Sequence, residues 1–343
     1  MAYTTIPKSS AYFNTKLYTG NVSTNAITGV GFQPDITWLK ERDGTQDHYL
    51  YDAVRGVQNY LTPNLTTQEQ ANVTSLTAFN SDGFTLGSNT ATNANNGLFA
   101  SWNWKANGSG ATNTAGSINT TYTSANTTSG CSIITYTGNA TAGATIGHGL
   151  GIKPSMVIIK NLAGNDWIVY TQALTANKIL YLNTTGVEND NSVFFNDTEP
   201  TDSLITLGSI SATNGSGAMI AYCFSDVQGY SKQGSYIGNG NANGTFNYTG
   251  FKPAFVLTKN SSSGGSNWRI FDNQRLGYNV NNATLYPNLT NAEADETSLD
   301  LLSNGFKMRG TTNDLNGSGQ TYVYMAFAEE PLVSTNGNAA TAR

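Results

Sequence analysis

The amino-acid sequence predicts an all-β protein with minor helix, built from three tandem domains that are β-sandwich or jelly-roll-like. One set of motifs occurs three times along the 343 residues. No segment shows the sustained apolar spacing at i, i+3, i+4 and i+7 that marks an amphipathic helix. Charged residues make up 11% of the chain, against ~25% in an average soluble domain. Asn, Thr, Ser and Gly carry the polarity instead, and these residues suit strand faces and tight turns.

The repeated motif begins with a tyrosine, has a glycine two residues later, and runs through a proline to a lysine. A glycine-containing turn precedes each proline, and the lysine follows the proline by six residues. The three copies contain Tyr18, Gly20, Pro34 and Lys40; Tyr136, Gly138, Pro154 and Lys160; and Tyr236, Gly238, Pro253 and Lys259. Three matches at similar internal spacing indicate that the chain is a triplicated unit.

Further strands follow in the same order in each copy. The apolar runs between proline and lysine predict buried strands over residues 35–39, 155–159 and 254–258. Copies one and three share a Pro-Asn-Leu-Thr segment and later an Asp-Gly or Asn-Gly pair, which signals a type I′ hairpin. Each copy closes with a small-residue turn and an aromatic strand, over residues 97–104, 217–224 and 319–327. Short strands separated by turns are typical of a sandwich.

These motifs place repeat 1 at residues 10–107, repeat 2 at 130–228 and repeat 3 at 229–332, after an N-terminal arm of residues 1–9. The motif prolines are 120 and then 99 residues apart, so the extra length falls between repeats 1 and 2. Residues 108–129 are rich in Gly, Ser, Thr and Asn, which predicts a linker. Within it, residues 117–122 are a candidate additional edge strand. Residues 333–343 have the composition of a C-terminal tail.

The charge distribution argues against nucleic-acid binding. The net charge is −5, and lysine and arginine are scattered without the positive stripe that phosphates require. No apolar run reaches the ~18 residues of a membrane span, so we expect no membrane insertion. The N-terminus lacks the regions of a secretory signal, so the Asn-x-Ser/Thr triplets, such as the one at Asn64, are expected to be unglycosylated.

The sequence predicts no cofactor and no metal site, because His48 and His148 are the only histidines and lie in different repeats. Cys131 and Cys223 lie on the first and last predicted strands of repeat 2. Terminal strands of a sandwich can be neighbours, so a disulfide is one interpretation. Two buried, small apolar side chains are the other, and we favour it.

No catalytic residues are predicted. The carboxylates at 295–296 and 329–330 are sequence neighbours and would point to opposite faces of a strand, whereas a glycosidase pair faces across a cleft. The loop of residues 196–202 is rich in oxygen ligands but lacks the spacing of a calcium loop. His148 lies in a glycine turn without the strand–loop–helix context or nucleophile of a catalytic motif.

Aromatic side chains and neutral loops are the better candidates for recognition. Tryptophans at repeat-equivalent strand positions are expected mainly in the core, although aromatic rings can also stack on sugars or anchor interfaces. The loops of residues 89–97 and 238–244 are rich in Asn and Gly, whose neutral amides can pair with sugar hydroxyls. We therefore expect any recognition surface to lie in such loops.

The motifs of copy one run from Tyr-Thr-Gly-Asn at 18–21 through Gly-Phe-Gln-Pro-Asp-Ile-Thr-Trp-Leu-Lys at 31–40 to Trp-Asn-Trp-Lys at 102–105. This pattern resembles a repeated β-rich domain of uncharacterised function in structural proteins of marine bacteriophages, including cyanophage and pelagiphage tail-fibre or virion proteins. Residues 135–161 resemble the companion repeat of that family. The resemblance covers most of the chain and implies a phage particle, with no catalytic residues to carry over.

We therefore expect a non-enzymatic virion structural protein, most simply a surface fibre, receptor-binding or adhesion component. A head decoration protein or a tail or neck stabilising protein is the alternative, and a polysaccharide depolymerase is a less favoured one. The expected partners are other virion proteins, a host-surface glycan and further copies of the chain. A homo-oligomer, with a trimer favoured, follows from the need of β-rich fibre modules to cover their edges. The expected location is the virion surface, after assembly in the host cytoplasm.

Overall fold

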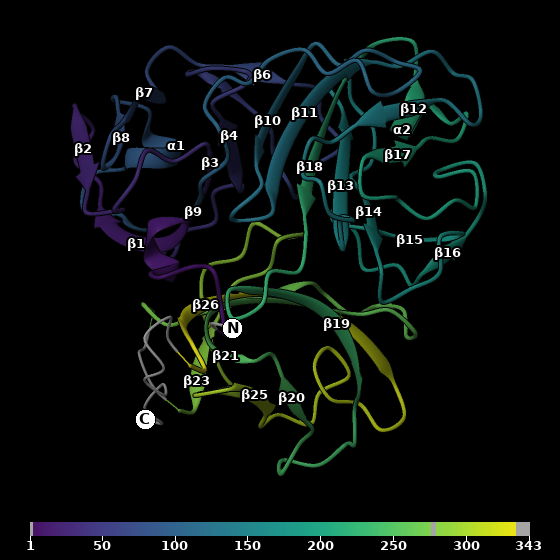
Figure 1. Cartoon of the computed structure of the whole chain (residues 1–343). Coiled ribbons are helices and arrows are strands. Elements are labelled where there is room, and N and C mark those ends of the chain that lie inside the picture. The colour runs from purple at the N-terminus through teal and green to yellow at the C-terminus, as the bar shows by residue number, and fades with distance from the viewer. Residues whose placement is uncertain (1–2, 276–278, 334–343) are drawn as a thin grey trace.

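The computed structural model describes residues 3–275 and 279–333, and its strands form three groups around a common centre (Figure 1). The protein is 42% strand and 3% helical, which confirms the predicted all-β class with minor helix. The purple and blue strands of repeat 1 and the teal strands of repeat 2 lie side by side in the upper half of the view. The green and yellow strands of repeat 3 lie below them.

The elements follow one another in a similar order in each repeat. Repeat 1 contains η1 (Ser9–Ala11), β1 (Phe13–Thr19), β2 (Asn25–Thr28), β3 (Ile36–Glu41), β4 (Tyr49–Asp52), β5 (Asn59–Tyr60), β6 (Gln70–Ala71), β7 (Leu76–Asn80), β8 (Gly83–Leu86), α1 (Thr90–Asn93) and β9 (Leu98–Trp104). Repeat 2 follows β10 (Tyr122–Asn126) and contains β11 (Cys131–Thr137), β12 (Thr145–Gly147), β13 (Met156–Asn161), β14 (Ile168–Thr171), β15 (Lys178–Tyr181), β16 (Asn189–Asp190), β17 (Leu204–Thr206), α2 (Ser211–Asn214) and β18 (Ala218–Phe224). Repeat 3 contains β19 (Ser231–Ile237), β20 (Phe246–Tyr248), β21 (Phe251–Asn260), β22 (Arg269–Asp272), β23 (Asn281–Thr284), β24 (Ala294–Leu302), β25 (Gly305–Met308) and β26 (Thr321–Pro331).

Each repeat builds its inner sheet with the same antiparallel strand order. The orders are β1-β9-β3-β4, β11-β18-β13-β14 and β19-β26-β21-β22. In repeat 2 this sheet extends further, with β10 at one edge and β15 and β16 at the other. A second, outer layer is formed by β2-β8-β7, β12-β17 and β20-β25-β24-β23. Each repeat is therefore a two-layer sandwich.

The inner sheets are buried on both faces, so β3, β13 and β21 are buried along their whole length. Alternate residues of a strand point to opposite faces. In β3, Leu39 packs in the outer core of repeat 1, whereas Ile36 and Trp38 belong to a central core. In β13, Val157 faces the outer core of repeat 2 and Ile158 the central one.

The central core is shared by all three repeats. Trp104 and Phe13 of repeat 1 lie with ring centroids 5.1 Å apart, and Phe13 stacks on Phe327 of repeat 3 at 5.2 Å. Trp104 also contacts Phe224 of repeat 2 at 6.0 Å and Phe255 of repeat 3 at 5.6 Å. The inner faces of the three sheets thus bury one another within a single chain.

The segment predicted to be a linker, residues 108–129, folds against repeat 2. Strand β10 lies within it and pairs with β11, and Ile118 is buried in the outer core of repeat 2. The additional edge strand therefore exists, but it spans Tyr122–Asn126 and shares only its first residue with the predicted range 117–122. The small polar residues that suggested a linker satisfy the backbone here, since the Thr120 hydroxyl accepts from the Asn113 N–H at 2.8 Å. Composition does not distinguish such pairing from a free linker.

The N-terminal arm also packs against the body. Ile6 is 1% exposed and belongs to the central core, and the Tyr3 hydroxyl donates to the Gly250 carbonyl at 2.7 Å. Of the predicted C-terminal tail, residues 334–343 lie outside the described residues.

Candidate functional site

One buried asparagine in each repeat holds together the end of the sandwich where the repeated motif lies. Asn93, Asn214 and Asn316 are fully buried, and the side-chain oxygen of each accepts the backbone N–H of the asparagine in the motif, at 2.9–3.0 Å. The amide of Asn214 donates to the carbonyls of Thr141 and Gly208, and the other two make the corresponding bonds. Sequence reasoning missed these residues, although the fragments Ala-Thr-Asn, Ala-Thr-Asn and Leu-Asn before the closing turn were a visible signal.

The motif tyrosine and glycine serve the same structure. Tyr18, Tyr136 and Tyr236 donate their hydroxyls to the carbonyl of the residue just before the buried asparagine, at 2.6–2.8 Å. A Cβ on Gly20, Gly138 or Gly238 would lie 2.0, 2.1 or 2.3 Å from a backbone oxygen of the same turn. The predicted recognition loops, residues 89–97 and 238–244, are tied to these asparagines. The motif therefore holds exposed loops in fixed positions.

The motif prolines mark where the inner strand begins to pair. Pro34 and Pro154 precede β3 and β13. The residue after each proline donates its N–H to the carbonyl of the last residue of β9 or β18, Trp104 or Phe224. In repeat 3 the strand continues through Pro253, with a register shift on either side of it. Proline has no N–H for the ladder, which restricts it to such positions.

The motif lysines are buried and join neighbouring repeats. Their side chains lie on the same face as the central core, and each ammonium donates to a threonine carbonyl of the preceding repeat, with repeat 1 reaching repeat 3. The bonds are Lys40 to Thr290 at 3.1 Å, Lys160 to Thr66 at 3.1 Å and Lys259 to Thr185 at 3.5 Å. Burial lowers the pKa of each lysine from its ordinary 10.5 to about 8.

The Asn-x-Thr triplets that supply these carbonyls are also structural. Asn64, Asn183 and Asn288 accept the backbone N–H of His48, Trp167 and Trp268, respectively, at 2.9–3.0 Å. A ring nitrogen of each of those three residues then bonds to a carbonyl of the preceding repeat, at 2.8–3.1 Å. For His48 the Nδ1 accepts from Trp38, so Nε2 carries the proton, and burial lowers the pKa of this imidazole. The same contacts thus close a ring of three interfaces.

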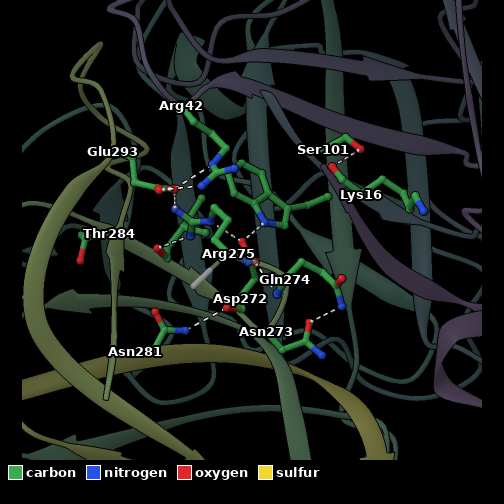
Figure 2. A network of polar contacts seen from close by, with 12 residues as sticks. Lys16, Arg42, Ser101, Asp272, Asn273, Gln274, Arg275, Asn281, Thr284 and Glu293 are labelled. Carbon is green, nitrogen blue, oxygen red and sulfur yellow. Dashed lines mark hydrogen bonds and ion pairs between the residues drawn. The ribbon is translucent and has the colours of Figure 1, made fainter. Parts of the chain in front are cut away.

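An ionic network fills the interface between repeats 1 and 3 (Figure 2). Arg275 and Asp272 have fully buried side chains and pair at 2.6 Å. Glu293 accepts from Arg275 at 3.0 Å and from Arg42 of repeat 1 at 2.8 Å. Burial alone would raise the pKa of Glu293, but hydrogen bonds from Arg42 and the charge of Arg275 give a net lowering. The Trp102 indole N–H donates to Asp272 at 2.9 Å.

The three interfaces differ at the centre of this network. Between repeats 1 and 2, Arg55 pairs with Asp52 at 2.6 Å, and the Tyr222 hydroxyl donates to Asp52 at 2.8 Å. Between repeats 2 and 3 the corresponding residues are Thr171, Leu174 and Met325. Met325 belongs to the central core there, and the partly buried Leu174 packs against that core. All these groups serve cohesion between repeats.

The other residues considered from sequence are also structural. Cys131 and Cys223 are free: they lie on paired strands but face the central core and the outer core respectively, so a disulfide is ruled out by strand periodicity. All five tryptophans are buried. Glu296 pairs with Arg269 and accepts from Tyr286, and Glu329 pairs with Lys252. Among residues 3–275 and 279–333, no group of three His, Cys, Asp or Glu could hold a metal ion.

An open groove in repeat 3 is the remaining candidate site. It has a volume of about 380 Å³ and lies between the N-terminal arm, the connection from repeat 2 and strands β19 and β20. It is lined by Tyr3, Asp226, Gln228, Gly229, Ser231, Lys232, Tyr248, Thr249 and Gly250.

Two tyrosines and one ion pair define the groove. The hydroxyls of Tyr3 and Tyr248 lie 3.4 Å apart, and burial, together with this contact, raises the pKa of Tyr3 to about 12. The Asp226 carboxylate accepts the Gln233 N–H at 2.8 Å and the Gln172 amide at 3.1 Å. Burial raises the pKa of Asp226 in spite of these bonds and of Lys232, whose ammonium lies 3.8 Å away.

Fold and groove together define an all-β protein of three sandwiches around one core, with a polar and aromatic recess in one of them. The chain belongs to the family described as a domain of unknown function, DUF7483, whose sequence profile matches residues 8–331. Comparison with curated proteins and with solved structures finds no match. No helix in the described part of the chain is long and apolar enough to cross a membrane.

Proposed function

We propose that the protein is a non-enzymatic structural component of a bacteriophage particle, exposed at the virion surface and acting in adhesion or receptor binding. The observation that carries this proposal is the shared central core, which fixes three sandwiches against one another and leaves their loops outside. Rigid scaffolds with exposed loops are a common basis of recognition. The resemblance of the repeated motifs to phage structural proteins supports the same conclusion.

The polar character of the loops agrees with an adhesive role. The buried asparagines hold the turns that follow the motif in all three repeats, so these loops need little ordering on binding. Pre-ordered loops lose less conformational entropy when a partner binds. Their Asn, Ser and Thr groups are neutral hydrogen-bonding partners of the kind that a glycan requires.

Adhesion is tested with purified protein and cells of the bacterium that the particle infects. We expect saturable binding to these cells and competition with adsorption of the intact phage. Cells of a resistant mutant that no longer adsorbs the phage are the control. Absence of both binding and competition would remove the adhesion proposal.

A decoration or stabilising role is the second proposal, because the compact body with three similar interfaces would also suit attachment to a particle lattice. Quantitative mass spectrometry of purified particles separates the two roles. Hundreds of copies per particle would support decoration, whereas a few to some tens would support a fibre or adhesion component.

The non-enzymatic assignment is supported by the engagement of one carboxylate in each of the two candidate pairs, 295–296 and 329–330. Glu296 is held by Arg269, and Glu329 is held by Lys252. We expect no release of reducing ends when the protein is incubated with capsular polysaccharide of the host. Turnover that disappears on substitution of a carboxylate pair would instead establish a depolymerase.

A homotrimer of chains stays a prediction. The inner sheets are already covered within one chain, so a trimer would have to use outer edges such as β10 or β16. Light scattering coupled to size-exclusion chromatography measures the mass directly, and 36.5 kDa is the mass of one chain.

A further inference from the structure

Comparison of the three repeats separates residues that the fold requires from residues that it does not. The motif tyrosines, glycines and lysines and the buried asparagines occur in every copy with the same contacts. Two side chains of the groove, Lys232 and Tyr248, do not. Strand pairing places Lys232 in the position of Asn14 and Ser132, and Tyr248 in the position of Thr28 and Gly147. Two copies fold without these side chains, so repeat 3 does not need them for its sandwich.

We propose that this groove binds a neutral pyranose sugar, presented as the terminal residue of a surface glycan. The proposal rests on the adhesive function proposed above and names its ligand and its site. It follows from three properties of the groove, which are an accessible aromatic ring, unused hydrogen-bonding groups and a balanced charge.

The aromatic wall is supplied by the two tyrosines. Tyr248 is 52% exposed, although aromatic side chains are usually covered when they serve only the core. The Tyr3 hydroxyl is anchored to the Gly250 carbonyl, which fixes one edge of the groove. The apolar C–H face of a pyranose packs on such a ring, while its hydroxyls remain free to pair elsewhere.

The polar groups of the groove have capacity left for hydroxyls. Within the described residues, the Gln228 amide has no hydrogen-bond partner, and it offers both donors and an acceptor. The Lys232 ammonium has one partner, Asp226, at the long distance of 3.8 Å. The Asp226 carboxylate accepts the Gln233 N–H at 2.8 Å and the Gln172 amide at 3.1 Å and also interacts with the Ser155 hydroxyl, yet the side chain is 33% exposed and lines the groove as an acceptor. Sugar hydroxyls both donate and accept, so they match this mixture.

Charge and size favour a neutral sugar over an anion. Asp226 and Lys232 balance each other, and an anionic ligand would be repelled by the carboxylate. The volume of about 380 Å³ is at the lower end of the ~300–1,000 Å³ that is usual for ligand pockets. One or two sugar rings fit such a space, and a longer glycan would continue into solvent through the open side.

The test is saturation-transfer NMR with four probes: the methyl glycosides of glucose, mannose, galactose and N-acetylglucosamine. We expect transfer to at least one of them from the wild-type protein. Tyr248→Ala should weaken that binding at least tenfold, because it removes the stacking ring. Phe246→Ala is the matched control, since Phe246 lies two residues away on β20, is 43% exposed and does not line the groove. It should change the binding less than twofold.

Lys232→Met is a second variant that should keep the fold, since the only partner of the ammonium in the described part of the chain is Asp226, at 3.8 Å. We expect a loss of affinity of about fivefold or more, with an unchanged melting temperature. Absence of transfer to all four probes from the wild-type protein would overturn the proposal. Equal binding by the wild type, Tyr248→Ala and Lys232→Met would do so as well.

Cell-binding measurements distinguish failure of this site from failure of the proposed function. If the protein binds cells but Tyr248→Ala binds them equally well, adhesion stands and the groove is not its site. If the probes bind and the protein does not bind cells, the sugar site stands and adhesion fails. Competition of cell binding by the best methyl glycoside, lost in Tyr248→Ala, would support both.

Discussion

In the motif Tyr-x-Gly-Asn, each residue type meets a separate structural demand. The tyrosine spans the sandwich and satisfies the carbonyl just before the buried asparagine. The glycine lets two backbone segments meet, and the asparagine N–H ends on the buried amide. An unpaired buried polar group costs ~1–3 kcal/mol, so removing one partner affects several others. Residue identity at these positions is therefore fixed by geometry.

Gly138→Ala should destabilise the protein, because the new Cβ would lie 2.1 Å from the Gly215 carbonyl oxygen. Backbone on both sides must move, and we expect a loss of ~2–4 kcal/mol in the free energy of unfolding, as for overpacked sites with strain. Urea denaturation measures it. Gly217→Ala is the matched control, because nothing lies within 4 Å of its added Cβ. It should stay within ~0.5 kcal/mol of wild type. Equal effects of the two substitutions would contradict the close-approach explanation.

The buried lysines make stability depend on pH in a defined window. Their pKa is about 8 in the folded protein and an ordinary 10.5 in the unfolded chain. Between these values the unfolded chain binds more protons, so the free energy of unfolding should rise as the pH rises from 8. Above pH 10 the buried tyrosines act in the opposite sense, because burial raises the pKa of groups such as Tyr136 and Tyr236.

Urea denaturation at pH 7.5, 8.5 and 9.5 measures this slope. Lys160→Met should reduce it, because one of the three buried ammonium groups is gone. Lys8→Met removes an exposed lysine and should leave the slope unchanged. A wild-type stability that is flat or falling between pH 8 and 10 would show that the carbonyls around the lysines fully compensate for burial.

At the scale of the elements, the corresponding positions of the three interfaces between repeats are filled by two different sets of side chains. Two use a buried Asp–Arg pair with an aromatic donor, and the third uses Thr171, Leu174 and Met325. Replacing a buried ion pair by well-packed apolar residues is often neutral, whereas removing one partner leaves a buried charge uncompensated. The interface between repeats 2 and 3 shows that this backbone accepts the apolar solution.

Arg275→Leu alone should therefore be costly, at ~3–5 kcal/mol, because it leaves Asp272 buried without its cation. The triple substitution Asp272→Thr, Arg275→Leu and Trp102→Met copies the corresponding residues of the interface between repeats 2 and 3. It should recover most of that loss. Denaturation of the single and triple variants measures the difference, and equal losses would refute the equivalence of the two solutions.

The strand pattern was largely predictable from sequence. The segments from proline to lysine became β3, β13 and β21, because apolar, β-branched runs bounded by turns rarely form anything else. The shared core was not predictable, since a strand that is apolar on both faces does not reveal which neighbour covers the second face. The sequence shows that the motif lysines recur in each repeat, but it does not show that their side chains are buried. The groove escaped notice because Tyr3, Asp226 and Tyr248 come from three separate segments.

At the scale of the whole molecule, the central core makes the repeats depend on one another. Trp104 contacts rings of all three repeats, and each interface closes through the same lysine, ring-nitrogen and glutamate contacts. The backbone N–H groups of Glu69, Glu188 and Glu293 donate across the interfaces at 2.8, 2.9 and 2.6 Å. Domains with separate cores could unfold separately, whereas these repeats lose part of their core if one of them opens.

We expect a single calorimetric unfolding transition for the wild-type protein. Trp104→Ala should cost ~3–5 kcal/mol and shift that transition as a whole, because the cavity lies in the shared core. Phe84→Ala removes a ring from the outer core of repeat 1 alone and should shift the same single transition. Two resolved transitions in either variant would show that a repeat unfolds on its own.

The closure of this ring within one chain also bears on how the protein can diverge. In a ring of identical subunits, every substitution appears at all interfaces and on all lobes at once. Here the three repeats have separate sequences within one chain. An Asp–Arg pair at two of the interfaces can therefore coexist with Thr171 and Leu174 at the third. For the same reason, repeat 3 carries Lys232 and the exposed Tyr248 at positions where the other two repeats have neither a lysine nor a tyrosine. Because all three repeats are in one chain, residues of repeat 3 such as Lys232 and Tyr248 can differ from the corresponding residues of the other repeats while the shared scaffold is kept.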